Sequence, residues 1–500
     1  GVYYDETYKD PPLSTAYNQI HIPGANSRGT NFVATANGIY IAQGDHCLVL
    51  DPASGRTLNR IGLPGDPGGA ESEWGYIGVY NSLLIAGEGL VRYTDFLLDV
   101  LEGKKKPFYN LDITTSKRLV VLDRHTGQVL WTRQSDLGFR HNAIAVGNDK
   151  IYCIDMMPPQ AADALRRRGR TVPGSPMLLA LDAATGELVW SADEGIFGTW
   201  LGYSEAYDVL IEAGRPSRDM LRGEPNRGMA AYGGDDGRQL WRQDVSYAAP
   251  CILHGRTIIT NRYAYDLLTG TQKNRAAPLT GEDTLWGYSR RYGCNYAVAS
   301  EHLLTFRSAA AGYYDLENDG GTGNLGGFKS GCTSNLIVAN GVLNAPDYTR
   351  TCNCSYQNQS SLALVHDPDV EMWVTYFGER GDGPLQEVGI NLGAPGNRRA
   401  EDGRFWIGHP LLPYVRNPEK ESGIGVDVEV TFDDGEFYTH HSSRITNDRE
   451  LGWVTASGCR GISRLELDLG TQERVRCRVR LHFAEPDRIE PGHRGFDVAI

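Results

Sequence analysis

Short runs of alternating apolar and polar residues recur along most of the chain, and polar turns separate them. This alternation has the two-residue period of a half-buried β-strand, because successive side chains of a strand face opposite sides. Many runs occur in pairs around a short turn and predict hairpins. The clearest pairs are 34–42, 143–152, 252–259, 298–304 and 336–343. Two other segments, 95–101 and 161–168, predict short helices inside long loops.

A second feature follows several of these hairpins, and we call it the turn phrase. It is an apolar strand, then Asp-x-x-Ser/Thr-Gly, then another strand that often carries Trp. Copies lie at 47–55, 119–131, 178–190, 231–241 and 265–270, with weaker echoes at 314–320 and 365–373. Its defining residues are Asp51, Gly55, Asp123, Gly127, Trp131, Asp182, Gly186, Trp190, Gly237, Trp241, Asp266 and Gly270.

Each residue type of the turn phrase has a physical role. The Asp side chain accepts backbone N–H groups two residues on and starts a turn. The Gly adopts a positive φ that a Cβ would resist. A Trp after the Gly is a large flat group that suits the gap between neighbouring sheets.

Two hairpins per unit predict a four-stranded antiparallel sheet, and seven such units lie between about 31 and 377. Four-stranded units arranged radially form a β-propeller, which protects its sheet edges by closure. The long four-strand unit disfavours a β-solenoid or a simple sandwich. The fold class is therefore all-β, and because residues 1–30 lack a complete unit we expect eight blades in the parent chain.

The character of the sequence changes near residue 377. We predict a propeller over 1–377 with an incomplete N-terminal blade, and a linker rich in Gly, Arg and Asp over 378–404. Residues 405–500 predict a β-sandwich that is truncated at its C-terminal end, with strands at 426–432, 452–456, 463–469 and 475–483.

Composition supports this division and excludes several classes of protein. Gly and Pro account for 60 and 24 of the 500 residues, a larger share than the roughly 12% that the two make up in an average chain. This excess fits many tight turns. The length exceeds the roughly 250–300 residues at which single cores stop growing. A net charge of −13 repels phosphate backbones, so nucleic acid is not an expected partner. No run approaches the roughly 18 apolar residues of a membrane span, and we expect a monomer.

The turn phrase resembles the quinoprotein-like (PQQ-like) propeller repeat over about 31–377. That repeat occurs in quinone-dependent dehydrogenases and in non-catalytic scaffolds of outer-membrane assembly. The overall layout resembles large propeller proteins of Planctomycetes-type bacteria. Residues 479–486 and 492–498 resemble part of a malectin-like carbohydrate-binding domain.

The resemblance raises the question of a PQQ and calcium site. The dehydrogenases have a vicinal Cys-Cys pair over the quinone, whereas this chain has only Cys352-Asn353-Cys354. Calcium takes six to eight oxygen ligands, and no Asp-x-Asp-x-Asp-Gly loop is present. We therefore expect no cofactor, and PQQ with calcium remains the alternative. We also expect no metal site and no catalytic residues.

Four of the nine cysteines cluster late in the predicted propeller, at Cys294, Cys332, Cys352 and Cys354. Four cysteines allow three disulfide pairings, and sequence does not choose among them. Disulfides would indicate an oxidising compartment, while a tetrahedral zinc site and free thiols remain open. Cys459 and Cys477 either pair or pack as apolar residues.

Polar residues that could face the propeller channel are candidates for ligand binding: His141, Arg307, Asn335, Asp347, Tyr348 and Arg350. An Arg offers a planar fork to a carboxylate, which suits an acidic sugar. Tyr348 beside Arg350 also has the ingredients of acid/base chemistry in a polysaccharide-active enzyme. The alternative is that these residues tie blades together.

In the C-terminal domain, Tyr438, His440, His441 and Trp453 are candidates for stacking on a sugar ring, or for core packing. Taken together, the sequence predicts a non-catalytic, extracytoplasmic scaffold that binds protein or carbohydrate partners. The alternative is an enzyme, either a quinone-dependent oxidoreductase or a polysaccharide-active enzyme that uses the channel.

Overall fold

The computed structural model describes most of the chain from residue 32 onward. The described residues are 32–65, 72–93, 114–216, 224–288, 290–291, 293, 295–326, 328, 336–345, 361–367, 369–375, 381–410, 426–445, 450–470, 476–487, 489–490, 492–493, 495 and 497–499.

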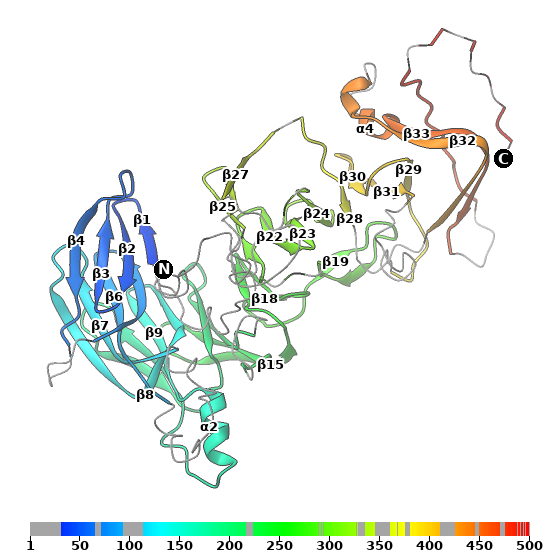
Figure 1. The fold of residues 1–500 in the computed structure, drawn as a ribbon. Coiled ribbons are helices and arrows are strands. Elements are labelled where there is room, and N and C mark those ends of the chain that lie inside the picture. The colour runs from blue at the N-terminus through cyan, green and yellow to red at the C-terminus, as the bar shows by residue number, and fades with distance from the viewer. Residues whose placement is uncertain are drawn as a thin grey trace.

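The molecule is almost entirely built of antiparallel sheets that follow one another along the chain, as the alternating pattern predicted (Figure 1). We number these sheets as blades. Blade 1 contains β1 (Phe32–Thr35), β2 (Gly38–Gln43), β3 (His46–Leu50) and β4 (Thr57–Gly62). Blades 2 and 3 form one sheet from β5 (Trp74–Tyr80), β6 (Leu83–Leu90), β7 (Thr115–Asp123), β8 (Val129–Gly147), β9 (Lys150–Asp155), β10 (Met177–Asp182) and β11 (Leu188–Ala192). The long strand β8 is the outer strand of blade 2 in its first half and the inner strand of blade 3 in its second half.

Blade 4 has the predicted four strands, whereas the sheet of blade 5 has three. Blade 4 contains β12 (Trp200–Ser204), β13 (Val209–Ala213), β14 (Arg227–Gly233) and β15 (Gln239–Ser246). Blade 5 contains β16 (Ile252–His254), β17 (Thr257–Ile259) and β18 (Ala264–Asp266), and β19 (Asn274–Ala276) pairs separately with β20 (Asp283–Leu285). The fifth turn phrase has Asn274 where the second to fourth have Trp, so its outer strand lacks the residue that docks on the next blade.

The last propeller sheets complete this series. Blade 6 contains β21 (Val298–Ala299), β22 (Leu303–Ser308), β23 (Ala310–Asp315) and β24 (Thr322–Asn324), to which β28 (Val374–Thr375) adds. Blade 7 contains β25 (Ile337–Ala339), β26 (Val342–Ala345) and β27 (Leu362–Val365) among the described residues.

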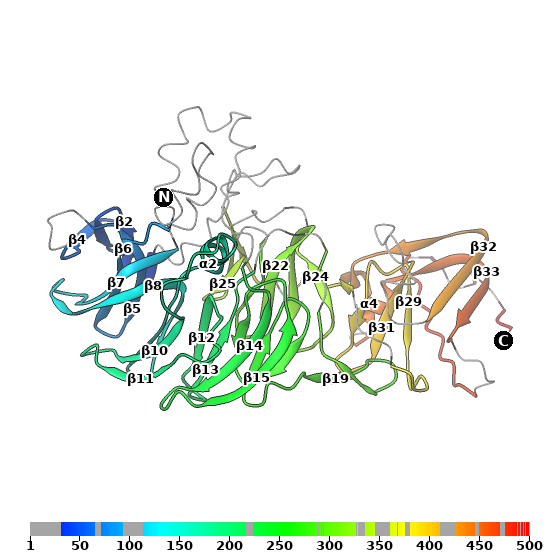
Figure 2. The same cartoon turned by 90° about the horizontal axis from the view of Figure 1, so that it is seen from below.

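The blades are arranged around an axis, with the first strand of each blade innermost. Strand β5 lies against β1 and β8, β12 lies against β8 and β16, and β16 lies against β21. Figure 2 shows the blades side by side in sequence order. This is the arrangement of a β-propeller. The eight-blade expectation for the parent chain stays a prediction.

The turn phrase has the predicted geometry. Gly55, Gly127, Gly186, Gly237 and Gly270 all have φ between 68° and 75°. In the third copy, the Asp182 carboxylate accepts the backbone N–H groups of Ala184 and Thr185 at 3.0 and 2.8 Å, and the Thr185 hydroxyl at 2.9 Å. Asp51, Asp123 and Asp266 make the equivalent bonds.

The Trp of the second, third and fourth phrases docks on the Gly of the phrase that follows it. The Trp131 indole N–H donates to the Ala183 carbonyl at 2.9 Å, and its ring covers Gly186 so closely that a Cβ there would lie 2.6 Å from the ring. Trp190 packs in the same way on Gly237, and Trp241 on Gly270. The Trp therefore joins consecutive blades, as the sequence predicted.

The helix predicted at 161–168 is confirmed as α2 (Pro159–Arg166), whose buried face packs against Tyr93 and Met157. The other predicted helix, 95–101, lies outside the described residues. No helix in the described part of the chain is both long enough and apolar enough to cross a membrane.

The C-terminal part differs from its prediction in several places. Its strands are β29 (Gly389–Leu392), β30 (Arg398–Arg399), β31 (Phe405–His409), β32 (Asp427–Thr439) and β33 (Ser457–Asp468), with a short 3-10 helix η4 (Ser442–Arg444). Strand β29 pairs in parallel with β31, so the predicted linker contains two strands of this unit. Figure 2 shows the unit beyond β19 and β24, at the opposite end of the molecule from blade 1. The sandwich and the domain boundaries stay predictions.

Two predicted C-terminal strands are wrong. Residues 452–456 begin with a helical turn, α4 (Gly452–Thr455), because it buries the consecutive residues Trp453 and Val454, which would face opposite sides of a strand. Residues 476–483 are exposed and belong to no strand. Their alternation of Arg with apolar residues fits a strand, but no neighbouring strand within the described residues pairs with them.

Candidate functional site

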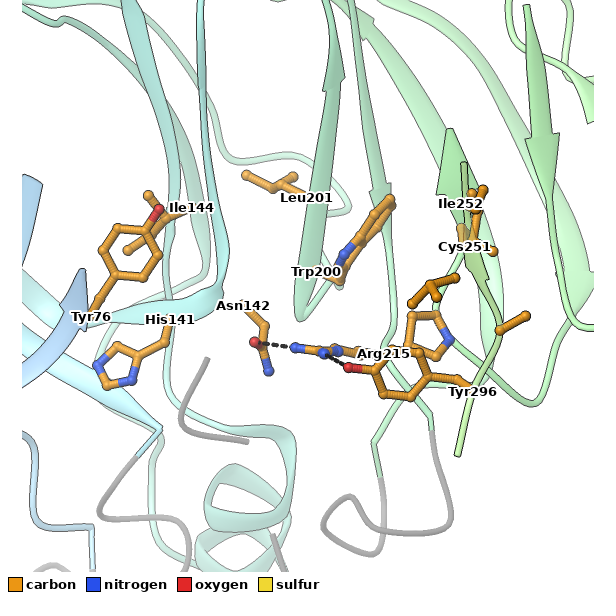
Figure 3. Close-up of a pocket in the computed structure, with 14 residues that line it drawn as sticks. Tyr76, His141, Asn142, Ile144, Trp200, Leu201, Arg215, Cys251, Ile252 and Tyr296 are labelled. Carbon is orange, nitrogen blue, oxygen red and sulfur yellow. Dashed lines mark hydrogen bonds between the residues drawn. The ribbon is translucent and has the colours of Figure 1, made fainter. Parts of the chain in front are cut away.

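The propeller axis contains a pocket of about 370 Å³. It is formed where the inner strands β5, β8, β12, β16 and β21 converge (Figure 3). Its lining residues are Tyr76, His141, Asn142, Ile144, Trp200, Leu201, Arg215, Pro250, Cys251, Ile252, Tyr296, Ala297, Val298 and Ala299. The volume falls within the roughly 300–1,000 Å³ of small-molecule sites.

One arginine crosses this pocket. The Arg215 guanidinium donates to the Asn142 side-chain oxygen and, at 2.7 Å, to the Tyr296 hydroxyl, as the dashed lines in Figure 3 show. The guanidinium also lies 5.3 Å from the centre of the Tyr296 ring. Because Asn142 belongs to blade 3 and Tyr296 precedes blade 6, Arg215 braces opposite sides of the channel.

A second polar contact fixes the imidazole at the pocket wall. The His141 Nε2 lies 2.8 Å from the Ser116 hydroxyl, and both residues are buried. A Cβ at Gly75 would collide with both side chains, so this Gly makes room for the pair. The contact orients the imidazole that faces the cavity.

Two titratable side chains of the pocket, Tyr76 and Cys251, stay protonated at neutral pH. Burial raises the pKa of the Tyr76 phenol to about 12 and that of the Cys251 thiol to about 12. Tyr76 is thus a neutral hydroxyl, and Cys251 is a thiol rather than the thiolate that acts as a nucleophile. The pocket offers hydrogen bonds, aromatic faces and one guanidinium.

This donor set does not fit calcium-bound PQQ. The described pocket lining contains one amide side chain, Asn142, and no carboxylate. Calcium takes six to eight oxygen ligands, which these residues do not supply.

The structure describes two of the predicted channel residues, His141 and Arg307, and of these two His141 lines the pocket. Arg307 is 2% exposed inside blade 6, where its backbone N–H donates to Asn295, and it does not line the cavity. The other predicted residues, Asn335, Asp347, Tyr348 and Arg350, lie outside the described residues. Sequence reasoning missed Arg215 and Trp200. Trp200 is the first residue of the inner strand β12, so inspecting the first residues of the inner strands would have identified it.

Sequence reasoning also missed a set of buried carboxylates near the ends of the second strands. Asp155 ends β9 and accepts the backbone N–H groups of Asp136, Leu137 and Gly138 at 2.7, 2.8 and 2.7 Å. Glu88 on β6 accepts from the Gly65 N–H at 2.9 Å. The signal that the sequence offered was an acidic residue at or near the end of an apolar second strand. These carboxylates hold the segments that lead into the inner strands of blades 2, 3 and 4, so we call them entry clamps.

The third entry clamp, Glu212, is fully buried on β13. It accepts the Phe197 and Gly198 N–H groups at 2.7 and 2.6 Å and the Tyr232 hydroxyl at 2.8 Å. Burial raises the pKa of Glu212 above its ordinary value of 4.5, although these hydrogen bonds oppose the shift. A carboxyl with a raised pKa stabilises the fold fully below that ordinary value, and this contribution is lost as pH rises through the folded pKa.

We therefore expect Glu212→Gln to be at least as stable as the wild type at pH 8, because the amide oxygen still accepts both N–H groups without a buried charge. Its advantage in melting temperature should shrink as the pH falls toward about 4. Thermal melts across this range provide the measurement, with the exposed Glu187→Gln as control. A variant that is less stable than the wild type at pH 8, and by the same amount at pH 4, would contradict the sign of the effect.

The outer strands of four consecutive blades share a bulge. In β4, β8, β11 and β15 the register with the third strand skips one residue next to the turn. The skipped residues are Leu58, Leu130, Val189 and Leu240, which are 58%, 45%, 45% and 37% exposed. We call these four the rim residues. A bulge re-aims a side chain and protects an edge from strand addition, so each blade presents an aliphatic side chain outward.

The four sugar-binding candidates lie in the C-terminal unit, but they do not form one open aromatic surface. Trp453 is 8% exposed, with Arg398 4.8 Å from its ring centre and Trp373 and Trp406 both 5.8 Å from it. The exposed His441 ring contacts the Asp369 carbonyl at 2.8 Å. Tyr438 and His440 are half-buried, with ring centres 5.5 Å apart. The contacts of Trp453 with Trp373 and of His441 with Asp369 join the C-terminal unit to the segment around β28.

The cysteines predicted to form disulfides, Cys294, Cys332, Cys352 and Cys354, lie outside the described residues. Among the described cysteines, Cys459 and Cys477 are not bonded to each other, and Cys47, Cys153 and Cys251 are free and buried.

Comparison with known proteins supports a PQQ-like propeller. The family model for the outer membrane protein assembly factor BamB matches residues 115–289, which include blades 3, 4 and 5 and part of blade 2. No curated protein matches the chain.

Solved structures resemble the chain only distantly. BamB from Moraxella catarrhalis is 14% identical over 63% of this chain and 80% of its own, with a TM-score of 0.37. A quinohemoprotein alcohol dehydrogenase from Pseudomonas putida HK5 is 14% identical over 57% of this chain and 51% of its own, with a TM-score of 0.33. A europium-containing methanol dehydrogenase is 12% identical over 60% of this chain and 68% of its own, with a TM-score of 0.33. Likeness at this level carries no inference about ligands or partners.

Proposed function

We propose that the chain is a non-catalytic, extracytoplasmic propeller scaffold that binds a protein partner along its outer rim. The observation that carries this proposal is the row of rim residues, one on each of blades 1 to 4. Single exposed aliphatic residues are common on soluble proteins. Here they occupy the same bulge position on four successive blades, which favours a surface that meets an apolar partner.

The rigid joints between blades support a scaffold. Docked Trp residues join blades 2 to 5, and the entry clamps fix the segments that cross from one blade to the next. A rigid array keeps the rim residues at fixed spacing, so a partner can contact several without ordering them first. The description of the matching family model, an outer membrane assembly factor, favours the extracytoplasmic location.

The other predicted functions have less support. The described lining of the axial pocket does not supply the oxygen ligands of a PQQ and calcium site, and the predicted polysaccharide-active pair, Tyr348 and Arg350, lies outside the described residues. A malectin-like, carbohydrate-binding role for the C-terminal unit stays a prediction, for which Tyr438 and His440 are the remaining half-exposed candidates.

Photo-crosslinking tests the proposal by position. A photoreactive residue is placed at each rim position of the full chain in its native cell, and at the exposed control position Ala206, on a turn of blade 4. We expect the same partner to be captured from at least two neighbouring rim positions and not from position 206. Capture from the control alone, or unrelated adducts at every position, would contradict a rim interface.

A further inference from the structure

We infer that the turn at the end of α2 binds the phosphate headgroups of an anionic membrane surface. This turn contains Arg166, Arg167, Arg168 and Arg170, and we call it the arginine turn. It lies in the connection between β9 and β10, at the opposite end of β10 from the rim residue Val189. The surface is therefore separate from the rim, and either proposal can fail without the other.

The arginine turn concentrates positive charge on an acidic chain. The connection 156–176 contains four Arg and one acidic residue, Asp163, whereas the whole chain has a net charge of −13. All four arginines are exposed. Arg166 pairs with Asp163 at 2.9 Å, but both side chains are more than half exposed, and pairs of this kind contribute little. Within the described part of the chain, the Arg167 and Arg168 side chains form no ion pair.

Backbone hydrogen bonds hold the arginine turn in one conformation. The Arg167 and Arg168 N–H groups donate to carbonyls of the last helical turn, at 3.0 Å each. Gly169 follows with a φ of 67°, which ends the helix and reverses the chain. Beneath the turn, Leu165 is 5% exposed and packs in one cluster with Tyr93. The guanidinium groups therefore extend from an anchored backbone, and binding does not have to order it first.

The helix dipole does not account for this many cations. A dipole favours positive charge near the helix C-terminus, but its effect falls off within the last turn. Arg167 and Arg168 are neighbours in sequence, and like charges that are close together repel one another. A surface that carries many negative charges would neutralise both.

The exposed side chains of the arginine turn suit lipid headgroups better than a protein. Between 163 and 175 the exposed residues are Asp, Arg, Gly, Thr, Pro and Ser, and the Ala, Leu and Val side chains pack toward the α2 cluster. Protein interfaces usually have an apolar core from which charged residues are depleted. A membrane surface needs no such core, because arginines bind phosphate oxygens directly and each one near an anionic surface adds attraction.

The charge at the other end of the blades would orient the molecule on such a surface. Asp182 lies at the far end of β10 from the arginine turn. Backbone and hydroxyl hydrogen bonds from Thr185 hold the pKa of Asp182 below its ordinary value, so it is ionised at neutral pH. Asp51 and Asp123 occupy the same position in blades 1 and 2. An anionic membrane thus attracts the arginine turn, which projects with α2 from the lower edge of the propeller in Figure 1, and repels the turn phrases.

The test measures cosedimentation of the full chain with vesicles of phosphatidylglycerol and phosphatidylcholine in equal parts, and with vesicles of phosphatidylcholine alone. We expect binding to the anionic vesicles only, with release as the salt concentration rises, because salt screens exposed charges. Equal binding to both kinds of vesicle would overturn the role of charge. No binding to the anionic vesicles would overturn the inference.

Two soluble anions test whether the membrane is the partner. Inorganic phosphate and a short DNA duplex are titrated into the protein by calorimetry. We expect neither to bind as tightly as the anionic vesicles do. Tighter binding of the duplex would assign the arginine turn to nucleic acid, and equally tight binding of phosphate would assign it to a free anion. Either result would overturn the membrane surface.

Paired variants then locate the binding. Arg167→Gln with Arg168→Gln should weaken binding to the anionic vesicles about 30-fold, the equivalent of about 2 kcal/mol. The control is Arg56→Gln with Arg238→Gln, which removes the same charge from exposed positions that follow the Gly of two turn phrases, and it should leave binding nearly unchanged. Because all four side chains are exposed, the melting temperatures should stay close to that of the wild type. Equal weakening by both pairs would show that net charge governs binding and would contradict the inference.

Discussion

Trp131→Ala is expected to destabilise the propeller by about 3–5 kcal/mol, because it empties a large site between two blades. Trp131 is 9% exposed, its ring covers Gly186, and its indole N–H donates to Ala183 in the next blade. The loss removes apolar contacts on both sides of the joint. Urea unfolding followed by circular dichroism should show a lower transition midpoint.

The matched control is the neighbouring rim residue, Leu130. It is 45% exposed, so Leu130→Ala should change stability by less than about 0.5 kcal/mol. Equal effects of the two substitutions would show that the Trp does not join the blades. Gly186→Ala tests the same joint from the other side, since its φ of 74° and the Trp131 ring both disfavour a Cβ.

Asp155→Ala is expected to cost about 3 kcal/mol or more, because three backbone N–H groups lose their acceptor. Asp155 is 7% exposed, and the Gly138 N–H that it accepts is buried. Asp155→Asn should have an intermediate effect, since one oxygen can still accept from Leu137 and Gly138 while the N–H of Asp136 loses its partner.

Thermal and urea unfolding of both variants measure this effect. Amide hydrogen exchange should also show faster exchange at residues 136–138, because their acceptor is changed. If Asp155→Ala unfolds at the same urea concentration as the wild type, the entry clamp does not stabilise the fold.

The sequence was sufficient to predict the blade units because their signals are local. Asp182, Thr185 and Gly186 form one turn within five residues, so the turn phrase specifies its own geometry. The position of the Trp on the next strand could also be predicted. A large aromatic side chain that recurs at the same place in successive units is expected to pack against the same feature of each following unit. These predictions used only residues near one another in the chain.

The site could not be predicted in the same way, because its residues come from different blades. Arg215 meets Asn142 and Tyr296, which are 73 and 81 residues away in sequence. Arg307 has the same chemistry in the sequence but is enclosed within its own blade. Nothing in the local pattern separates an arginine that enters the channel from one that does not.

The rim shows a similar limit. The pattern Gly-x-apolar-apolar-Trp identifies Val189 as part of a strand, and strict alternation would place either Leu188 or Val189 inward. The bulge leaves both exposed, and it is visible only in the pairing with β10. The C-terminal Trp453 is a related case, because the sequence left open whether it stacks on a sugar or packs in the core, and the structure places Arg398 over its ring.

The most direct test of the rim interface is the affinity of the captured partner for the wild-type chain and for Val189→Lys, measured by calorimetry. Val189 is exposed, so the substitution should leave the melting temperature nearly unchanged while placing a charge where an apolar contact is proposed. We predict an affinity at least about tenfold lower, the equivalent of about 1.4 kcal/mol. Binding as tight as that of the wild type, in Val189→Lys and likewise in Leu130→Lys, would contradict the rim as the interface.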